Sequence, residues 1–181
     1  MFGLQRLFFE LLFLLFIFIG NLFSGIGFTV MAPMILARTD QNSLVFGTVQ
    51  TAGAIGGIVG GIVMSAWGGF KKQTYTMLMG LFGMGIGMLM VAFAPASLLL
   101  LAILGLLVGS AMLALINGSG WAILQTLVAP EKQGRVFSVV ISITGAVSPL
   151  GLAVGGPIAD RLGIRTLYLV AGVVILILAV I

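Results

Sequence analysis

The sequence of 181 residues contains neither cysteine nor histidine. Without cysteine there is no disulfide frame and no thiol chemistry, and without both residue types a zinc or haem site lacks its usual ligands. We therefore expect no metal and no cofactor. Charge is also scarce, at 7% of residues, whereas an ordinary soluble domain carries about a quarter. With 61% hydrophobic residues, most of this chain must have lipid as its solvent.

Long apolar stretches decide how the chain crosses the membrane. A crossing segment must be a helix of roughly 20 apolar residues or a strand of a closed barrel. Barrel strands alternate polar and apolar residues, but residues 98–107 form an unbroken apolar run with one glycine. The sequence therefore predicts an all-α integral membrane protein. Its six predicted spans cover about residues 8–36, 44–66, 75–93, 98–128, 136–159 and 166–181. The sixth span is short and is interpreted as cut off.

The few charged residues gather in short clusters between the spans. Arg6, Lys71, Lys72, Lys132 and Arg135 fall on one predicted side, and Arg38, Arg161 and Arg165 fall on the other. Because cytoplasmic loops carry the excess of Lys and Arg, the first side is predicted to be cytoplasmic. The net charge of +4 is attributed to loops facing anionic headgroups of membrane lipid, and no nucleic-acid partner is expected.

Polar residues are distributed unevenly among the spans. The first, second, fourth and fifth spans contain them, whereas residues 78–94 are apolar throughout. Since polar side chains in a bilayer turn inward, the pattern predicts a cavity lined by those four spans, with the third and sixth spans outside. The candidates for the cavity wall are Asn21, Gln50, Asn117, Trp121 and Gln125. Hydrogen bonding between helices is the alternative role for each. Methionines of the third span are interpreted as lipid-facing: Met77, Met79, Met84, Met88 and Met90.

Two glycine pairs indicate an internal repeat. Gly60-Gly61 precedes Ser65, Ala66 and Gly68, and Gly155-Gly156 precedes Asp160, Arg161 and Gly163 with the same spacing. Three spans separate the copies, so the two triplets, about 1–95 and 96–181, would have opposite topology. Inverted repeats of this kind are typical of secondary transporters, although chance matching of abundant glycine is the alternative. The spacing of Gly53, Gly57 and Gly61 also predicts a face for close helix packing.

Two loops resemble those of a known family. The segment from Gly61 through Lys71 and Lys72 is similar to the signature loop of the major facilitator superfamily, in which an Asp-Arg pair follows the glycine. Here Ser65 and Ala66 stand at those two positions, a departure that removes the family's charge relay. The segment from Gln125 to Ser138 resembles a later loop of the same family, with Pro-Glu-x-x-Gly-Arg-Val-Phe at Pro130 to Phe137. Together these segments are most similar to the macrolide-efflux and exporter branch.

The resemblance implies both a fold and a role. The chain would be the C-terminal six-helix half of a twelve-helix secondary transporter that exports hydrophobic small molecules by alternating access. Its partners would be the missing N-terminal six-helix half or a second copy, and its location the bacterial plasma membrane. Gating residues carried over by the resemblance are Gly61, Ser65, Gly68, Lys71, Lys72, Glu131, Gly134, Arg135, Asp160 and Arg161. All four carboxylates lie at or near loop edges, so the spans offer no evident proton carrier.

Two alternatives to transport are compatible with parts of this sequence. A six-span protein that associates with itself and has a scaffold or lipid-handling role would share the same composition. An intramembrane serine protease is the other, because Gly118-Ser119-Gly120 resembles part of a rhomboid protease motif. That chemistry needs a base such as histidine to accept the serine proton. With none in the sequence, Ser119 is predicted to bond to its own helix, and no enzyme activity is expected.

Overall fold

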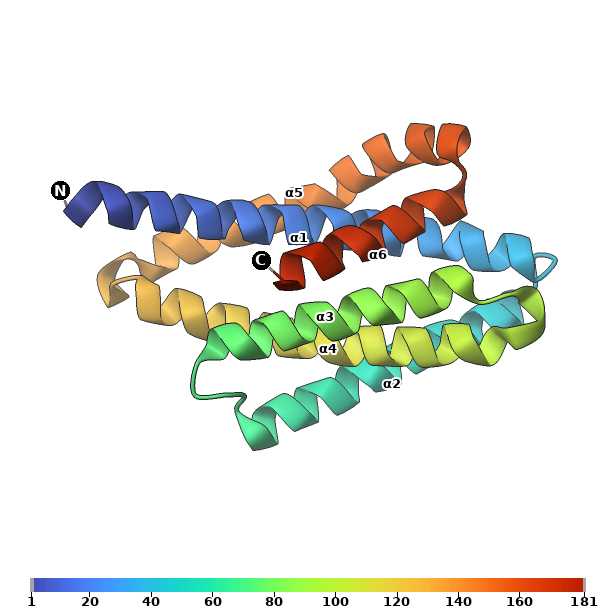
Figure 1. The fold of residues 1–181 in the computed structure, drawn as a ribbon, viewed down its shortest axis with the longest axis horizontal. Helices are drawn as coiled ribbons and strands as arrows, with labels where there is room; N and C mark the ends of the chain where they lie inside the picture. Colours follow the sequence, from blue (N-terminus) through green and yellow to red (C-terminus); the bar gives the residue numbers. More distant parts are fainter. Residues whose placement is uncertain (1, 181) are drawn as a thin grey trace.

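Residues 2–180 fold into six α-helices and one short 3-10 helix. The computed structural model describes the backbone of residues 2–180, and side chains throughout this range except at 2–14, 16, 17, 96, 146–152, 154–156 and 160. The helices are α1 (Phe2–Arg38), α2 (Ser43–Trp67), α3 (Gln73–Phe93), η1 (Ala96–Leu98), α4 (Leu99–Leu127), α5 (Pro130–Leu162) and α6 (Ile164–Val180). Each predicted span coincides with one α-helix, and residues 2–180 contain no strand, which confirms the all-α prediction (Figure 1).

Helix ends lie where local chemistry places them. The Asn42 side chain caps α2 by accepting bonds from the backbone N–H groups of Leu44 at 3.0 Å and Val45 at 3.2 Å. Gly68 ends the same helix in the left-handed region, with φ 74°, a conformation that glycine adopts without steric cost. Pro130 begins α5, where its missing N–H would have had no intrahelical partner.

Four segments are long and apolar enough to cross a membrane within the described part of the chain. They are Phe18–Arg38 of α1 and the whole of α2, α3 and α4, while α6 is an apolar helix of 17 residues. The structure therefore has the helices of a multi-pass membrane protein. The count of six membrane spans remains a prediction.

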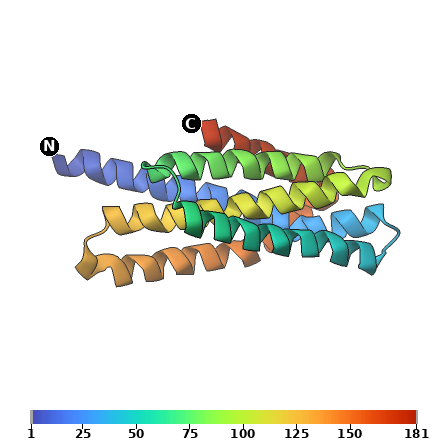
Figure 2. The ribbon, with the colours of Figure 1, turned by 90° about the horizontal axis from the view of Figure 1, so that it is seen from below.

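The helices pack as two groups joined through α3 and α6. In one group α4 packs against both α2 and α3, and in the other α1 packs against both α5 and α6. Contacts between α3 and α6 connect the groups. Seen from below, α3 and α6 lie on one side of the bundle and α2 and α5 on the other, with α1 and α4 between them (Figure 2).

The prediction that the third helix faces only lipid is wrong. In the most apolar stretch of α3, 56% of the residues are buried within the bundle, and Met77, Met84 and Met88 are each at most 6% exposed. Glycines allow the approach, since Gly87 meets the α4 backbone at Gly105 and Gly85 meets Leu176 of α6. Hydropathy could not reveal this, because lipid tails and packed side chains are equally apolar surroundings. The same correction applies to α6, where Ala171 and Ile175 are fully buried.

The packing face of α2 also differs from the prediction. A Cβ at Gly56 or Gly60 would meet the backbone of α4 at Leu107 or Ala111, whereas Gly57 and Gly61 have open space. Gly53 does face α4, against the Leu106 side chain. The contact face therefore includes Gly53 as predicted, but continues through Gly56 and Gly60 in place of Gly57 and Gly61.

Candidate functional site

A cavity of about 170 Å³ opens between four helices of the bundle. It is lined by α1, α3, α4 and α5. Three of these helices were predicted to line a cavity. The contribution of α3 and the absence of α2 correct that prediction. A shallower hollow continues along α1 past Phe28 and Thr29, on the side of the bundle away from α3.

Polar side chains from three helices meet around this cavity. They are Asn21 and Ser24 of α1, Asn117 and Trp121 of α4, and Thr144 of α5. None of the described residues that line the cavity is charged. The site can therefore offer hydrogen bonds and apolar contact to a small molecule, without a fixed charge to pair with.

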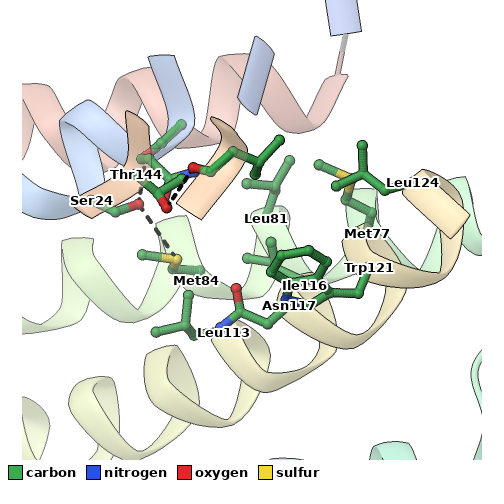
Figure 3. A pocket seen from close by; sticks show the side chains of 14 residues that line it. Ser24, Met77, Leu81, Met84, Leu113, Ile116, Asn117, Trp121, Leu124 and Thr144 are labelled. Carbon is green, nitrogen blue, oxygen red and sulfur yellow. Dashed lines mark hydrogen bonds between the residues drawn. The ribbon is translucent and has the colours of Figure 1, made fainter. Parts of the chain in front are cut away.

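The floor of the cavity is apolar and comes from α3. Met77, Leu81 and Met84 lie on one face of that helix and border the cavity (Figure 3). The Ser24 hydroxyl donates to the Gly20 carbonyl at 2.7 Å and lies 4.0 Å from the sulfur of Met84. The sequence interpretation missed this floor because it assigned these methionines to the lipid.

Trp121 is positioned by the loop that resembles the family motif. Its ring meets Phe137 of α5 edge to face, with centroids 5.2 Å apart and planes at 78°, a favourable aromatic arrangement. In the same loop, the Gln133 Nε2 donates to the carbonyls of Gln125 and Val128, both at 3.1 Å. Gln133 thus caps the end of α4 and fixes the turn that brings Phe137 to Trp121. Neither Gln133 nor Phe137 was singled out as a site residue from sequence.

The structure brings together three of the five cavity candidates. Asn21, Asn117 and Trp121 line the cavity. Gln50 is exposed on α2 and Gln125 is exposed near the end of α4, and neither borders the cavity. Substrate contact by any of the five stays a prediction.

The loop between α2 and α3 is built around two glycines in the left-handed region, Gly68 and Gly69. The Phe70 N–H donates to Thr76 Oγ1 at 2.8 Å, and the Gln73 Nε2 donates to the Gly68 carbonyl at 3.0 Å. Lys72 lies 5.9 Å from the centre of the Tyr75 ring. The turn is therefore short and internally bonded.

The remaining gating candidates lie at the two ends of the bundle. Ser65, Lys71, Lys72, Glu131, Gly134 and Arg135 are exposed in or beside the α2–α3 and α4–α5 loops, which share one end with the N-terminus (Figures 1 and 2). Arg161 is exposed at the opposite end. The side chain of Asp160 lies outside the described residues. Gating by these residues stays a prediction.

Ser119 is not placed as a nucleophile. It is fully buried, and its hydroxyl donates to the carbonyls of Leu115 at 2.6 Å and Ile116 at 3.2 Å. The predicted bonding to its own helix is confirmed.

Comparison with known proteins identifies relatives by sequence. The chain is 31% identical over 147 residues to the multidrug efflux pump Tap of Mycolicibacterium fortuitum, which covers 79% of the chain and 35% of that protein. It is 27% identical over 128 residues to macrolide efflux protein A of Streptococcus pyogenes, which covers 71% of the chain and 32% of that protein. The chain thus spans about a third of the length of these relatives. No solved structure gives a significant match.

The family itself follows from a match over nearly the whole chain. The family model of the Major Facilitator Superfamily matches residues 11–181, which include every helix that borders the cavity. A bundle of apolar helices around an uncharged cavity is in keeping with a membrane transporter. On this sequence match, the chain belongs to the Major Facilitator Superfamily.

Proposed function

We propose that this chain is one six-helix half of a secondary transporter that exports hydrophobic small molecules by alternating access. The cavity carries the proposal: side chains from α1, α3, α4 and α5 converge on one uncharged pocket within the bundle. Export is supported by the relatives, which are named as a multidrug efflux pump and a macrolide efflux protein. The chain covers only about a third of each relative, so the activity of the whole protein is itself part of the proposal.

An inverted repeat of two triplets is part of this proposal. Exchanging α1, α2 and α3 for α4, α5 and α6 maps the contact of α2 with α4 onto that of α5 with α1. The same exchange maps the contact of α3 with α4 onto that of α6 with α1, and the contact of α3 with α6 onto itself. Such pairing is what a two-fold axis between the triplets would produce, and inverted repeats place substrate sites near the bilayer midplane.

A second half would complete the binding site. The hollow beside the cavity is open along α1 and α4, so this chain supplies one wall and no closed path. Rocking of two six-helix halves about such a shared site would expose it to each side in turn. The location is proposed to be the plasma membrane of a bacterium, in line with the bacterial sources of the relatives. Members of this superfamily are generally not enzymes, and no catalytic role is proposed.

The proposal can be tested through the two tryptophans of the chain. Trp121 borders the cavity, whereas Trp67 lies beside the α2–α3 loop against Phe70. In the intact transporter, Trp121→Ala should weaken binding of erythromycin by about thirtyfold, which corresponds to an aromatic anchor's contribution of about 2 kcal/mol. Trp67→Ala is the control and should leave the dissociation constant unchanged.

Transport itself needs a separate measurement. Proteoliposomes containing the intact protein should accumulate erythromycin or ethidium against a concentration gradient when an ion gradient is imposed. Absence of both binding and accumulation over such a panel would contradict the proposal. That outcome would favour a six-span protein with a scaffold or lipid-handling role.

A further inference from the structure

Two α3 methionines, Met77 and Met84, face the cavity, a placement that their sequence pattern did not reveal. Met77 and Met84 are 6% and 3% exposed, and both border the cavity two helical turns apart. Leu81 lies between them on the same face and is 4% exposed. Met79 points the other way and is 37% exposed. The thioether side chains on this helix are therefore divided between the cavity and the outer surface.

The cavity combines a directional wall with an adaptable floor. The side chains of Asn21, Asn117 and Thr144 form hydrogen bonds only in particular directions. Met77 and Met84, by contrast, have unbranched side chains with three rotatable bonds and a polarisable sulfur, so they can fill spaces of different shape. Flexible methionine surfaces are a recurring device in proteins that bind many partners.

Room for this adjustment exists on the α3 side. The Met84 sulfur is 4.0 Å from the Ser24 hydroxyl, whose proton is already donated to the Gly20 carbonyl at 2.7 Å. Sulfur is a weak acceptor, so Met84 is not held by this contact. A void of about 20 Å³ bordered by Met84, Met88 and Tyr168 lies beyond the floor, enough space for the terminal methyl group of a side chain that shifts.

We propose that Met77 and Met84 determine how broad a range of ligand shapes the cavity accepts. The inference rests on the proposed function, because it concerns the same site. In this role the polar wall orients a ligand, and the two methionines reshape to contact its apolar part. Loss of their flexibility should narrow the range of ligands more than it lowers affinity in general.

The test compares a double variant with a matched control in the intact transporter. Met77→Leu with Met84→Leu keeps the side-chain volume and apolar character but replaces an adaptable chain by a branched one, a swap that cores usually tolerate. Met79→Leu makes the same chemical change on the outer face of α3. Dissociation constants are measured for erythromycin, ethidium and tetraphenylphosphonium, together with the thermal unfolding midpoint.

We expect the double variant to lose affinity for some probes and to keep it for others. For the double variant, the dissociation constant of at least one probe should stay within about twofold of the wild-type value. Binding of another probe should weaken by about tenfold or more, which is the effect of losing contact with about one methylene group. Met79→Leu should change none of them. Equal shifts for all probes, or no shift for any, would overturn the role of the methionines while leaving the proposed transporter intact. Failure of the wild-type protein to bind any probe would overturn both.

Discussion

At the scale of single residues, the contact between α2 and α4 depends on two glycines. A Cβ at Gly56 would overlap the backbone of Leu107, and a Cβ at Gly60 would overlap that of Ala111. Backbone atoms cannot move aside as a flexible side chain can, so any larger residue must push the helices apart. In a bilayer, where helices associate by close packing and gain nothing from apolar burial, such separation removes the main attraction.

We predict that Gly56→Ala and Gly60→Ala each destabilise the protein by about 1–3 kcal/mol, the usual range for overpacking. Gly57→Ala is the control, because nothing lies within 4 Å of its position and alanine is the better helix former. Thermal unfolding of the purified protein in detergent measures the difference. Equal losses at Gly56 and Gly57 would show that the helices do not cross as described.

The sequence reveals that α2 is rich in glycine but not which glycines touch a neighbour. Gly56 and Gly57 are adjacent, have the same composition around them, and fit equally well into small-residue spacings. Only the crossing of α2 over α4 separates them, and that crossing is set by residues on both helices. Helix existence could therefore be predicted from the chain, whereas the contact face could not.

At the scale of elements, the end of α3 is held by a residue of α1. Arg38 Nη1 donates to the carbonyls of Val91 and Ala94, and its Nη2 donates to that of Ala92, all at 2.9 Å. The last carbonyls of a helix have no intrahelical partner, and a cation there also offsets the helix dipole. Arg165 adds a second cation, 5.8 Å from the centre of the Phe93 ring.

Removing this clamp should loosen α3, the helix that forms the cavity floor. We predict that Arg38→Ala lowers the free energy of unfolding by about 2–3 kcal/mol, as expected for hydrogen bonds to a charged group. Arg38→Lys should recover only part of the loss, because an ammonium lacks the planar fork that reaches several carbonyls at once.

Arg161→Ala serves as the control for this prediction, since Arg161 is exposed at the same end of the bundle. Differential scanning calorimetry of the three variants compares their stability against unfolding. A loss no larger for Arg38→Ala than for Arg161→Ala would show that the clamp contributes nothing.

The role of α3 shows the limit of hydropathy for a membrane chain. Residues 78–94 contain no polar side chain, and the inference that such a helix meets only lipid was physically reasonable. It failed because burial against another helix and burial in lipid require the same apolar side chains. The polar cavity residues Asn21, Asn117 and Trp121 could be predicted, since polar groups have few other places to lie.

At the scale of the whole molecule, the charged loops sort to two ends of the bundle. The α2–α3 loop with Lys71 and Lys72 shares an end with the first turn of α5, which contains Lys132 (Figure 1). Arg38 and Arg165 lie at the opposite end. This arrangement has the segregation of positive charge that the sequence predicts. Which end is cytoplasmic follows from the excess of Lys and Arg, and it is still a prediction.

The absence of cysteine from the chain makes this orientation directly measurable. We predict that a single cysteine introduced as Lys72→Cys or Lys132→Cys reacts with a membrane-impermeant maleimide only after the cells are permeabilised. Gln41→Cys, in the exposed turn between α1 and α2, should react in intact cells, because an odd number of membrane crossings separates it from either lysine loop. All three positions lie outside the helices or in the first turn of one, so the substitutions should leave the bundle intact.

Labelling of Lys72→Cys and Lys132→Cys from opposite faces would contradict the shared end and, with it, the inverted triplets. Labelling of both from outside would keep the triplets but reverse the orientation.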